Sequence, residues 1–129
     1  MATQELQKPT ASELEILQVL WEYGPSTVRE VHEKLNAKRP MGYTGVLKLM
    51  QIMTVKGVVR RNETQRAHVY SAVQPAEKTK QQFALDVLQR VFDGSASELM
   101  MHALAGHKAS KEEMEELRRL LNEYERKLR

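Results

Sequence analysis

The chain has 129 residues, 41% of them hydrophobic and 29% charged, which fits one folded domain, or one small domain with an oligomerisation segment, and excludes a disordered chain. It has neither an apolar run of 18 residues nor a recognisable secretion signal, so we expect a cytoplasmic protein that does not insert into a membrane. Cysteine is absent, which excludes disulfides, thiolate metal sites and cysteine nucleophiles.

The net charge of +3 is concentrated in one segment of the chain. Residues 75–129 contain ten basic and ten acidic residues, and residues 1–37 are net negative. Between Lys38 and Arg66, seven Lys/Arg residues stand against Glu63 alone. This asymmetry favours a polyanion as partner, with a solvated basic face as the alternative.

Capping boxes predict the first two helices. The Ser/Thr-x-x-Glu spacing occurs at Thr10–Glu13 and again at Ser12–Glu15, ahead of an apolar run that ends at Gly24-Pro25. Thr27–Glu30 repeats the spacing, and apolar residues at helical intervals continue to Leu35. We therefore expect two helices separated by a short turn.

The next segment, Met41–Gly57, contains two lysines and no acidic residue. Its apolar residues Val46, Leu49, Met50 and Met53 follow the i, i+3, i+4, i+7 pattern of a helix with one face in a core. We expect a third helix here, with its other face toward a partner that a carboxylate would repel.

The hydrophobic period changes after this helix. Val58–Glu63 and Ala67–Val73 are rich in β-forming residues and are separated by Thr64-Gln65-Arg66, which predicts a hairpin. Three helices followed by a basic hairpin is the order of a winged helix-turn-helix. In that arrangement the third helix enters the major groove of DNA and the hairpin lies along the phosphates.

Helical patterns continue after Pro75. A helix is expected over Ala76–Phe92, followed by a short helix that includes Leu99–Leu104, and a capping box at Ser110–Glu113 starts the last helix. The expected buried side of the first of these helices consists of Phe83, Val87, Leu88, Val91 and Phe92.

The last helix has apolar residues at intervals of three and four, from Met114 to Leu128. This is the a/d seam of a coiled coil over about two heptads. We favour association of two chains through this seam over docking on the chain's own core.

The predicted fold is mainly α with a small β-hairpin: a winged helix-turn-helix DNA-binding domain over residues 1–74 and a helical dimerisation region over residues 75–129. The residues expected at DNA are Tyr43, Thr44, Lys48, Gln51, Arg60, Arg61 and Arg66. Lysine suits the acceptors of guanine, glutamine pairs with adenine, and a threonine near a helix start suits a phosphate. The residues expected at the dimer interface are Leu99, Leu104, Met114, Leu117, Leu121, Tyr124 and Leu128.

Catalytic patterns are absent from the sequence. The four histidines have no partner at the spacing of a metal site, and neither a P-loop nor a G-x-S-x-G motif occurs. We predict a protein that is not an enzyme and that needs no metal or cofactor.

The chain resembles the penicillinase repressor family of bacterial transcription regulators, which includes the β-lactamase and methicillin-resistance repressors. The resemblance runs nearly the full length. Its most specific parts are the E-x-x-x-L-x-x-x-W helix (Glu13, Leu17 and Trp21) and the segment Glu113–Leu121 of the closing helix, and it also includes Thr27–Leu35 and His68–Tyr70.

The resemblance implies a homodimer that binds dyad-symmetric operators and represses transcription. In some members a membrane-bound sensor protease triggers cleavage within the dimerisation region. Alignment on Ser110–Arg118 places the corresponding bond at His102–Ala103, although the Asn-Phe pair cleaved in those members is not present here.

The chain also departs from the family pattern. Gly45 interrupts the usual Thr-Thr-Val of the recognition helix, Ile52 stands where arginine is common, and Lys48 where threonine is common. Related copper-responsive repressors carry cysteine pairs, which this chain lacks.

Two other functions remain open from the sequence. In the first, the C-terminal helices sense a small molecule directly, with Met100, Met101 and Met114 lining an apolar pocket, although such methionines are more often core filler. In the second, the chain is a basic winged helix that recruits a protein partner and no longer reads DNA sequence. Gly45 in the recognition helix is the residue that motivates this alternative.

Overall fold

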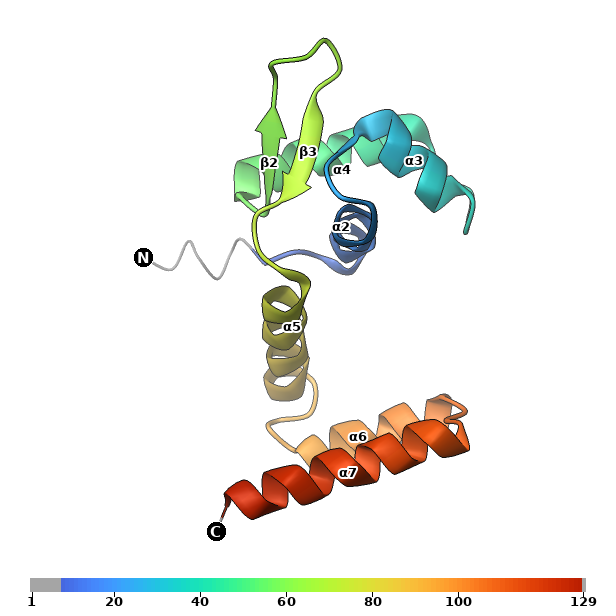
Figure 1. Cartoon of the computed structure of the whole chain (residues 1–129), viewed down its shortest axis with the longest axis vertical. Coiled ribbons are helices and arrows are strands. Elements are labelled where there is room, and N and C mark those ends of the chain that lie inside the picture. Colours follow the sequence, from blue (N-terminus) through green and yellow to red (C-terminus); the bar gives the residue numbers. More distant parts are fainter. Residues whose placement is uncertain (1–7, 129) are drawn as a thin grey trace. The chain divides into compact units, whose positions relative to one another are not determined.

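The computed structural model describes residues 8–128, which form two compact units that divide between Phe83 and Ala84. The first unit contains α2 (Ala11–Tyr23), β1 (Ser26–Thr27), α3 (Val28–Asn36), α4 (Tyr43–Lys56), β2 (Val59–Asn62), β3 (Val69–Ala72) and the start of α5 (Ala76–Arg90). The second contains the rest of α5, α6 (Ala96–Gly106) and α7 (Lys111–Lys127). Figure 1 labels the helices and the strands β2 and β3, and the expected mainly helical, winged-helix fold is confirmed.

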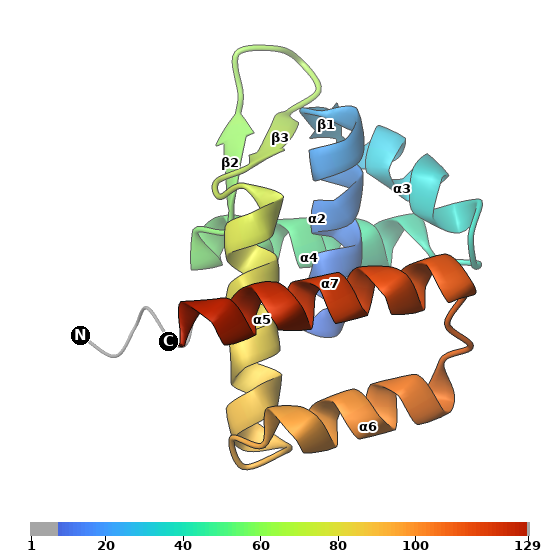
Figure 2. The ribbon, with the colours of Figure 1, turned by 60° about the horizontal axis from the view of Figure 1, so that its bottom comes forward.

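The sheet has one strand more than the expected hairpin. β2 and β3 pair antiparallel, and β1 joins the other side of β3, which gives the order β1-β3-β2. β1 precedes α3 directly, and its Ser26 and Thr27 stand opposite Tyr70 and Val69. The hairpin is therefore attached to the turn between the first two helices, as Figure 2 shows.

The helix starts follow the capping boxes. α2 begins after Thr10, whose Oγ1 accepts a hydrogen bond from the Glu13 amide (3.2 Å) while Glu13 Oε1 accepts one from the Thr10 amide (3.0 Å). α3 repeats this arrangement with Thr27 and Glu30, at 3.2 and 2.8 Å. α4 ends at Gly57, whose φ of 83° is the left-handed conformation that glycine adopts without steric cost.

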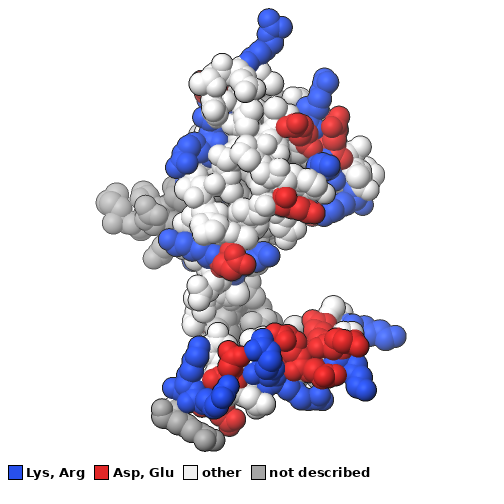
Figure 3. Space-filling view, viewed as in Figure 1, with Lys and Arg blue, Asp and Glu red and all other residues white. Residues whose placement is uncertain are grey.

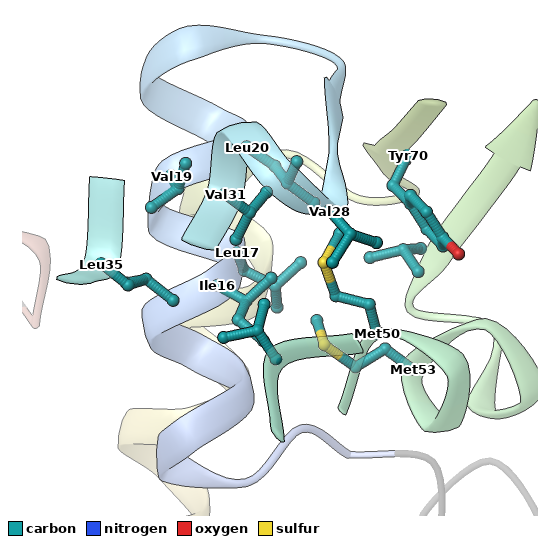
Figure 4. Close-up of a cluster of buried hydrophobic side chains, with 12 residues drawn as sticks. Ile16, Leu17, Val19, Leu20, Val28, Val31, Leu35, Met50, Met53 and Tyr70 are labelled. Atoms are coloured by element: carbon teal, nitrogen blue, oxygen red, sulfur yellow. The ribbon is translucent and has the colours of Figure 1, made fainter. Parts of the chain in front are cut away.

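The core of the first unit lies between α2, α3, α4 and the sheet. Figure 4 shows side chains of the three helices pointing toward one another, with Tyr70 of β3 beside them. The expected stripe of α4 is confirmed, since Val46, Met50 and Met53 are fully buried and Leu49 packs against them, half-buried. The buried set is Ile16, Leu17, Val19, Leu20, Val28, Val31, Leu35, Val46, Met50, Met53, Val59 and Tyr70.

The three residues of the E-x-x-x-L-x-x-x-W motif have separate structural roles in this unit. Glu13 caps α2, and Leu17 is part of the core. The Trp21 indole Nε1–H donates a hydrogen bond to the carbonyl of Gln74 (3.0 Å), which ties the end of α2 to the segment between β3 and α5. The motif therefore caps α2, packs it into the core and connects its end to Gln74.

The second unit contains no buried residue between Ala84 and Leu128. Of the five residues expected on the buried side of α5 none is fully buried, and Phe83, Val87, Leu88 and Phe92 are half-buried. Val91 is 66% exposed because α5 ends at Arg90 and the chain turns through Asp93 and Gly94, both with positive φ. Ser110 caps α7 as expected by accepting a hydrogen bond from the Glu113 amide (3.0 Å).

Candidate nucleic-acid interface

The exposed face of α4 combines polar and apolar side chains and carries no carboxylate. Thr44, Lys48, Gln51, Ile52 and Val55 are all exposed, and at 3.6 residues per turn they fall within an arc of about 120°. The three fully buried residues of the helix lie on the opposite side. The core therefore determines which face of α4 points outward.

The N-terminus of α4 has no side-chain cap and no acidic residue in its first turn. Gly42 occupies the cap position, so the first amides of the helix point outward with a partial positive charge, which suits an anion. Thr44 and Tyr43 are exposed at this end, Tyr43 to 46%. Two of the residues expected at DNA are thus grouped around an uncapped helix start.

Two residues of α3 hold the loop that leads into α4. The Met41 amide donates a hydrogen bond to Asn36 Oδ1 (3.0 Å), and the Met41 carbonyl lies 2.7 Å from His32 Nε2. The His32 ring also meets the ring of Tyr43 edge-on, with 5.7 Å between centroids. Sequence reasoning considered His32 only as a metal ligand, although its i, i+4 spacing with Asn36 places both residues on one side of α3.

The hairpin presents three arginines in different environments. Arg60 and Arg66 are exposed, whereas Arg61 stands opposite Tyr70 in the sheet and its Nη2 lies 2.5 Å from Glu63 Oε2. Hydrogen bonds to Tyr70 and then to Glu63 raise the pKa of Arg61 above its usual value. Arg60 and Arg66 are therefore freer than Arg61 to reach a phosphate.

Ion pairs reduce the basic excess that the sequence shows between residues 38 and 66. Lys56 pairs with Glu13 and Arg39 with Glu15, in addition to the pair of Arg61. Within the part of the chain that the structure describes, the basic residues of this segment without an ion pair are Lys38, Lys48, Arg60 and Arg66. In Figure 3 a basic side chain projects from the hairpin, whereas both signs of charge are mixed over α6 and α7.

The pair of Lys56 and Glu13 connects the end of α4 to the start of α2. Lys56 Nζ lies 2.9 and 3.1 Å from the two carboxylate oxygens of Glu13, and the Glu13 side chain is 2% exposed. Lys56 also donates to the carbonyl of Lys8 (3.4 Å). Because the first turn of α4 is held by α3 and its last turn by α2, the exposed face keeps one orientation.

The residues expected at a dimer interface all lie in α6, α7 and the residue that follows α7. Leu99, Leu104, Met114 and Leu117 are half-buried in the single chain. Leu121, Tyr124 and Leu128 are 67%, 61% and 87% exposed. The apolar seam of α7 thus has its C-terminal half open to solvent in one chain.

The residues at the expected cleavage position, His102 and Ala103, lie within α6. Both are exposed, and the His102 ring lies 5.7 Å from the ring of Phe92. A protease would have to unwind this helix, because its backbone is engaged in helical hydrogen bonds.

Among residues 8–128, no group of three or more His, Cys, Asp and Glu residues is placed to hold a metal ion. In the same part of the chain, no helix is both long and apolar enough to cross a membrane.

Comparison with known proteins extends over both units. The family described as "Penicillinase repressor" matches residues 9–123. Two relatives, each described as "Transcriptional regulator BlaI" and found in the CDC 1551 / Oshkosh and ATCC 25618 / H37Rv strains of Mycobacterium tuberculosis, are 33% identical over 102 residues. The matched part is 78% of this chain and 72% of each relative.

Proposed function

The chain belongs to the penicillinase repressor family of transcriptional repressors, and we propose that it is a sequence-specific repressor that binds dyad-symmetric operators as a homodimer. The observation that carries this proposal is the exposed face of α4, which is free of carboxylates and is oriented by contacts to α2 and α3. The unpaired Arg60 and Arg66 on the neighbouring hairpin supply the positive charge that a phosphate backbone requires.

In this proposal α4 lies in the major groove, which is about 12 Å wide and admits a helix. Lys48 and Gln51 contact base edges, the lysine at guanine and the glutamine at adenine. Thr44, Tyr43 and the uncapped amides at the start of α4 contact a phosphate. Arg60, Arg66 and, less freely, Arg61 neutralise phosphates along the hairpin.

We assign DNA reading to residues 1–74 and dimerisation to residues 75–129. The open apolar residues of α7 support this division, because residues 84–128 include half-buried apolar side chains but none that is fully buried, so a single chain gains little stability there from hydrophobic burial. A second copy packed along Leu121, Tyr124 and Leu128 would remove this apolar surface from water. The dimer also explains how two copies of α4 reach the two halves of one operator.

We place the derepressing signal at the dimerisation region, as proteolysis by a sensor protease or another event that separates the two chains. Loss of the dimer halves the number of contacts to DNA and so weakens binding. Met100 and Met101 are exposed on α6, and no observation favours the alternative in which these helices sense a small molecule directly.

The proposal is tested by fluorescence anisotropy of the full chain on duplexes tiled across the DNA upstream of its own gene, with excess non-specific competitor and at several salt concentrations. We expect tight binding to one dyad-symmetric tile. Equal, salt-sensitive binding to every duplex would leave a basic surface without a reading function, and no binding would refute the proposal.

A matched pair of variants tests the position of the DNA. Arg60→Gln in a dimer removes two phosphate contacts and should reduce the slope of log K against log salt by about 1.8. Lys111→Gln removes one charge per chain from the start of α7 and should leave the slope unchanged. Equal effects of the two substitutions would show that the hairpin does not lie on DNA.

A further inference from the structure

Two aliphatic side chains lie on the exposed face of α4, among the polar residues expected at DNA. Val55 is 88% exposed and Ile52 is 37% exposed, and the two are one helical turn apart. Val55 lies on the same line of the helix as Lys48, seven residues earlier. An isolated exposed aliphatic residue is ordinary, but this pair lies on the face of α4 that is proposed to meet DNA.

The polar and basic residues around this pair favour a polyanionic partner over an apolar protein surface. The helix carries no carboxylate, Lys48 and Gln51 flank the pair on the same face, and the hairpin supplies the unpaired Arg60. An apolar protein groove would have to desolvate the lysine without returning an opposite charge. DNA provides that charge at its phosphates, and it exposes an apolar group only at certain bases.

The apolar group in the major groove is the C5-methyl of thymine. Ile52 and Val55 have neither a donor nor an acceptor, so they cannot bond to the polar edge of any base. Opposite guanine, adenine or cytosine they would cover polar groups without replacing the hydrogen bonds of water. Opposite thymine they gain an apolar contact.

We propose that Ile52 and Val55 are specificity-determining residues that read thymine methyl groups in the major groove. The inference rests on the proposed function, because it requires that α4 lie in that groove. It assigns a base preference to the C-terminal half of the recognition helix, where lysine and glutamine alone would read only polar edges.

The test replaces every thymine of the bound operator with deoxyuridine, which removes the methyl groups and keeps all base-pairing groups. The operator is the tile identified by anisotropy. Burial of one methyl group corresponds to about a four-fold change in affinity, so one contact in each half-site gives about 15-fold. We expect wild type to bind the uracil duplex at least four-fold more weakly than the thymine duplex.

The variants locate the methyl contact on the protein. In Ile52→Ala/Val55→Ala the ratio of the two affinities should fall toward one, because alanine keeps the helix but lacks the outer methyl groups that make most of the proposed contact. Val73→Ala, a truncation of an exposed aliphatic residue outside α4, should keep the wild-type ratio.

Each outcome has one meaning. A wild-type ratio of one, or a ratio that the double variant leaves unchanged, overturns the inference while the repressor function stands. If the wild-type ratio is one and the double variant binds DNA as tightly as wild type, Ile52 and Val55 do not contribute to DNA binding, and the inference is overturned. Absence of any preferred duplex overturns the proposed function and this inference together.

Discussion

The ion pair between Glu13 and Lys56 should be the most sensitive polar contact in the first unit. Glu13 is 2% exposed and Lys56 is 20% exposed, so the carboxylate depends on its partner far more than the ammonium does. Removing one partner of a buried pair costs about 3–5 kcal/mol when it leaves an uncompensated charge. The two single substitutions should therefore have unequal effects.

Lys56→Met leaves the Glu13 carboxylate buried with the Thr10 amide as its donor, and we expect the free energy of unfolding to fall by about 3 kcal/mol. Glu13→Gln keeps an oxygen that can accept from Thr10, and Lys56 can extend into water. We expect that change to cost about 1.5–2 kcal/mol, the lower part of the range for a hydrogen bond to a charged group. In the double variant no charge remains buried, so it should be about as stable as Glu13→Gln alone.

The assay is urea unfolding followed by circular dichroism, with all variants at one protein concentration because the proposed dimer would be stabilised by mass action. Lys48→Met is the control: it removes a lysine of the same helix that has no ion pair within the described residues, and it should change stability by less than about 0.5 kcal/mol. Two results would refute the idea that Lys56 compensates the buried Glu13 carboxylate. In the first, Lys56→Met lowers the free energy of unfolding no more than Glu13→Gln does; in the second, the two losses add in the double variant.

Three further results are expected. Gly45→Ala should raise the free energy of unfolding by about 1 kcal/mol in the same assay, because an added Cβ meets no atom within 4 Å; a less stable variant would contradict this. Leu121→Glu should convert the proposed dimer to monomer in sedimentation velocity, whereas Asn122→Glu, on the neighbouring exposed position, should not; if both variants remain dimers, the proposed seam of α7 is refuted. The hydrogen bond from Arg39 lowers the pKa of Glu15, so this pair stabilises the folded chain above the ordinary carboxyl pKa, and the contribution is lost as the pH falls through the lowered value. The free energy of unfolding in urea should therefore be higher for wild type than for Glu15→Gln at neutral pH, and the two values should converge in acid. A difference between them that grows in acid would contradict a stabilising pair of Glu15 and Arg39.

Local signals determined the helices of this protein well. The capping boxes at Thr10 and Thr27 act within four residues, so they can be read without knowledge of the fold. The stripe of Val46, Met50 and Met53 predicted which face of α4 is buried, because helical periodicity depends only on neighbouring residues. The same pattern, by exclusion, indicated the face that is proposed to meet DNA.

Contacts between distant parts of the chain could not be predicted in this way. β1 has two residues and exists because it pairs with β3, more than 40 residues later. Lys56 was counted among the basic residues of the segment, but it pairs with Glu13, which lies 43 residues earlier. His32 was considered only as a metal ligand, although its partner is the carbonyl of Met41.

The amino-acid sequence by itself therefore determined the order of elements, the buried face of α4 and the family resemblance, all of which depend on short-range patterns. Only the tertiary structure decided which cations are unpaired, because an ion pair is a property of distance in space. It also decided that Val55 and Ile52 stand exposed beside Lys48, because exposure depends on what the rest of the chain covers.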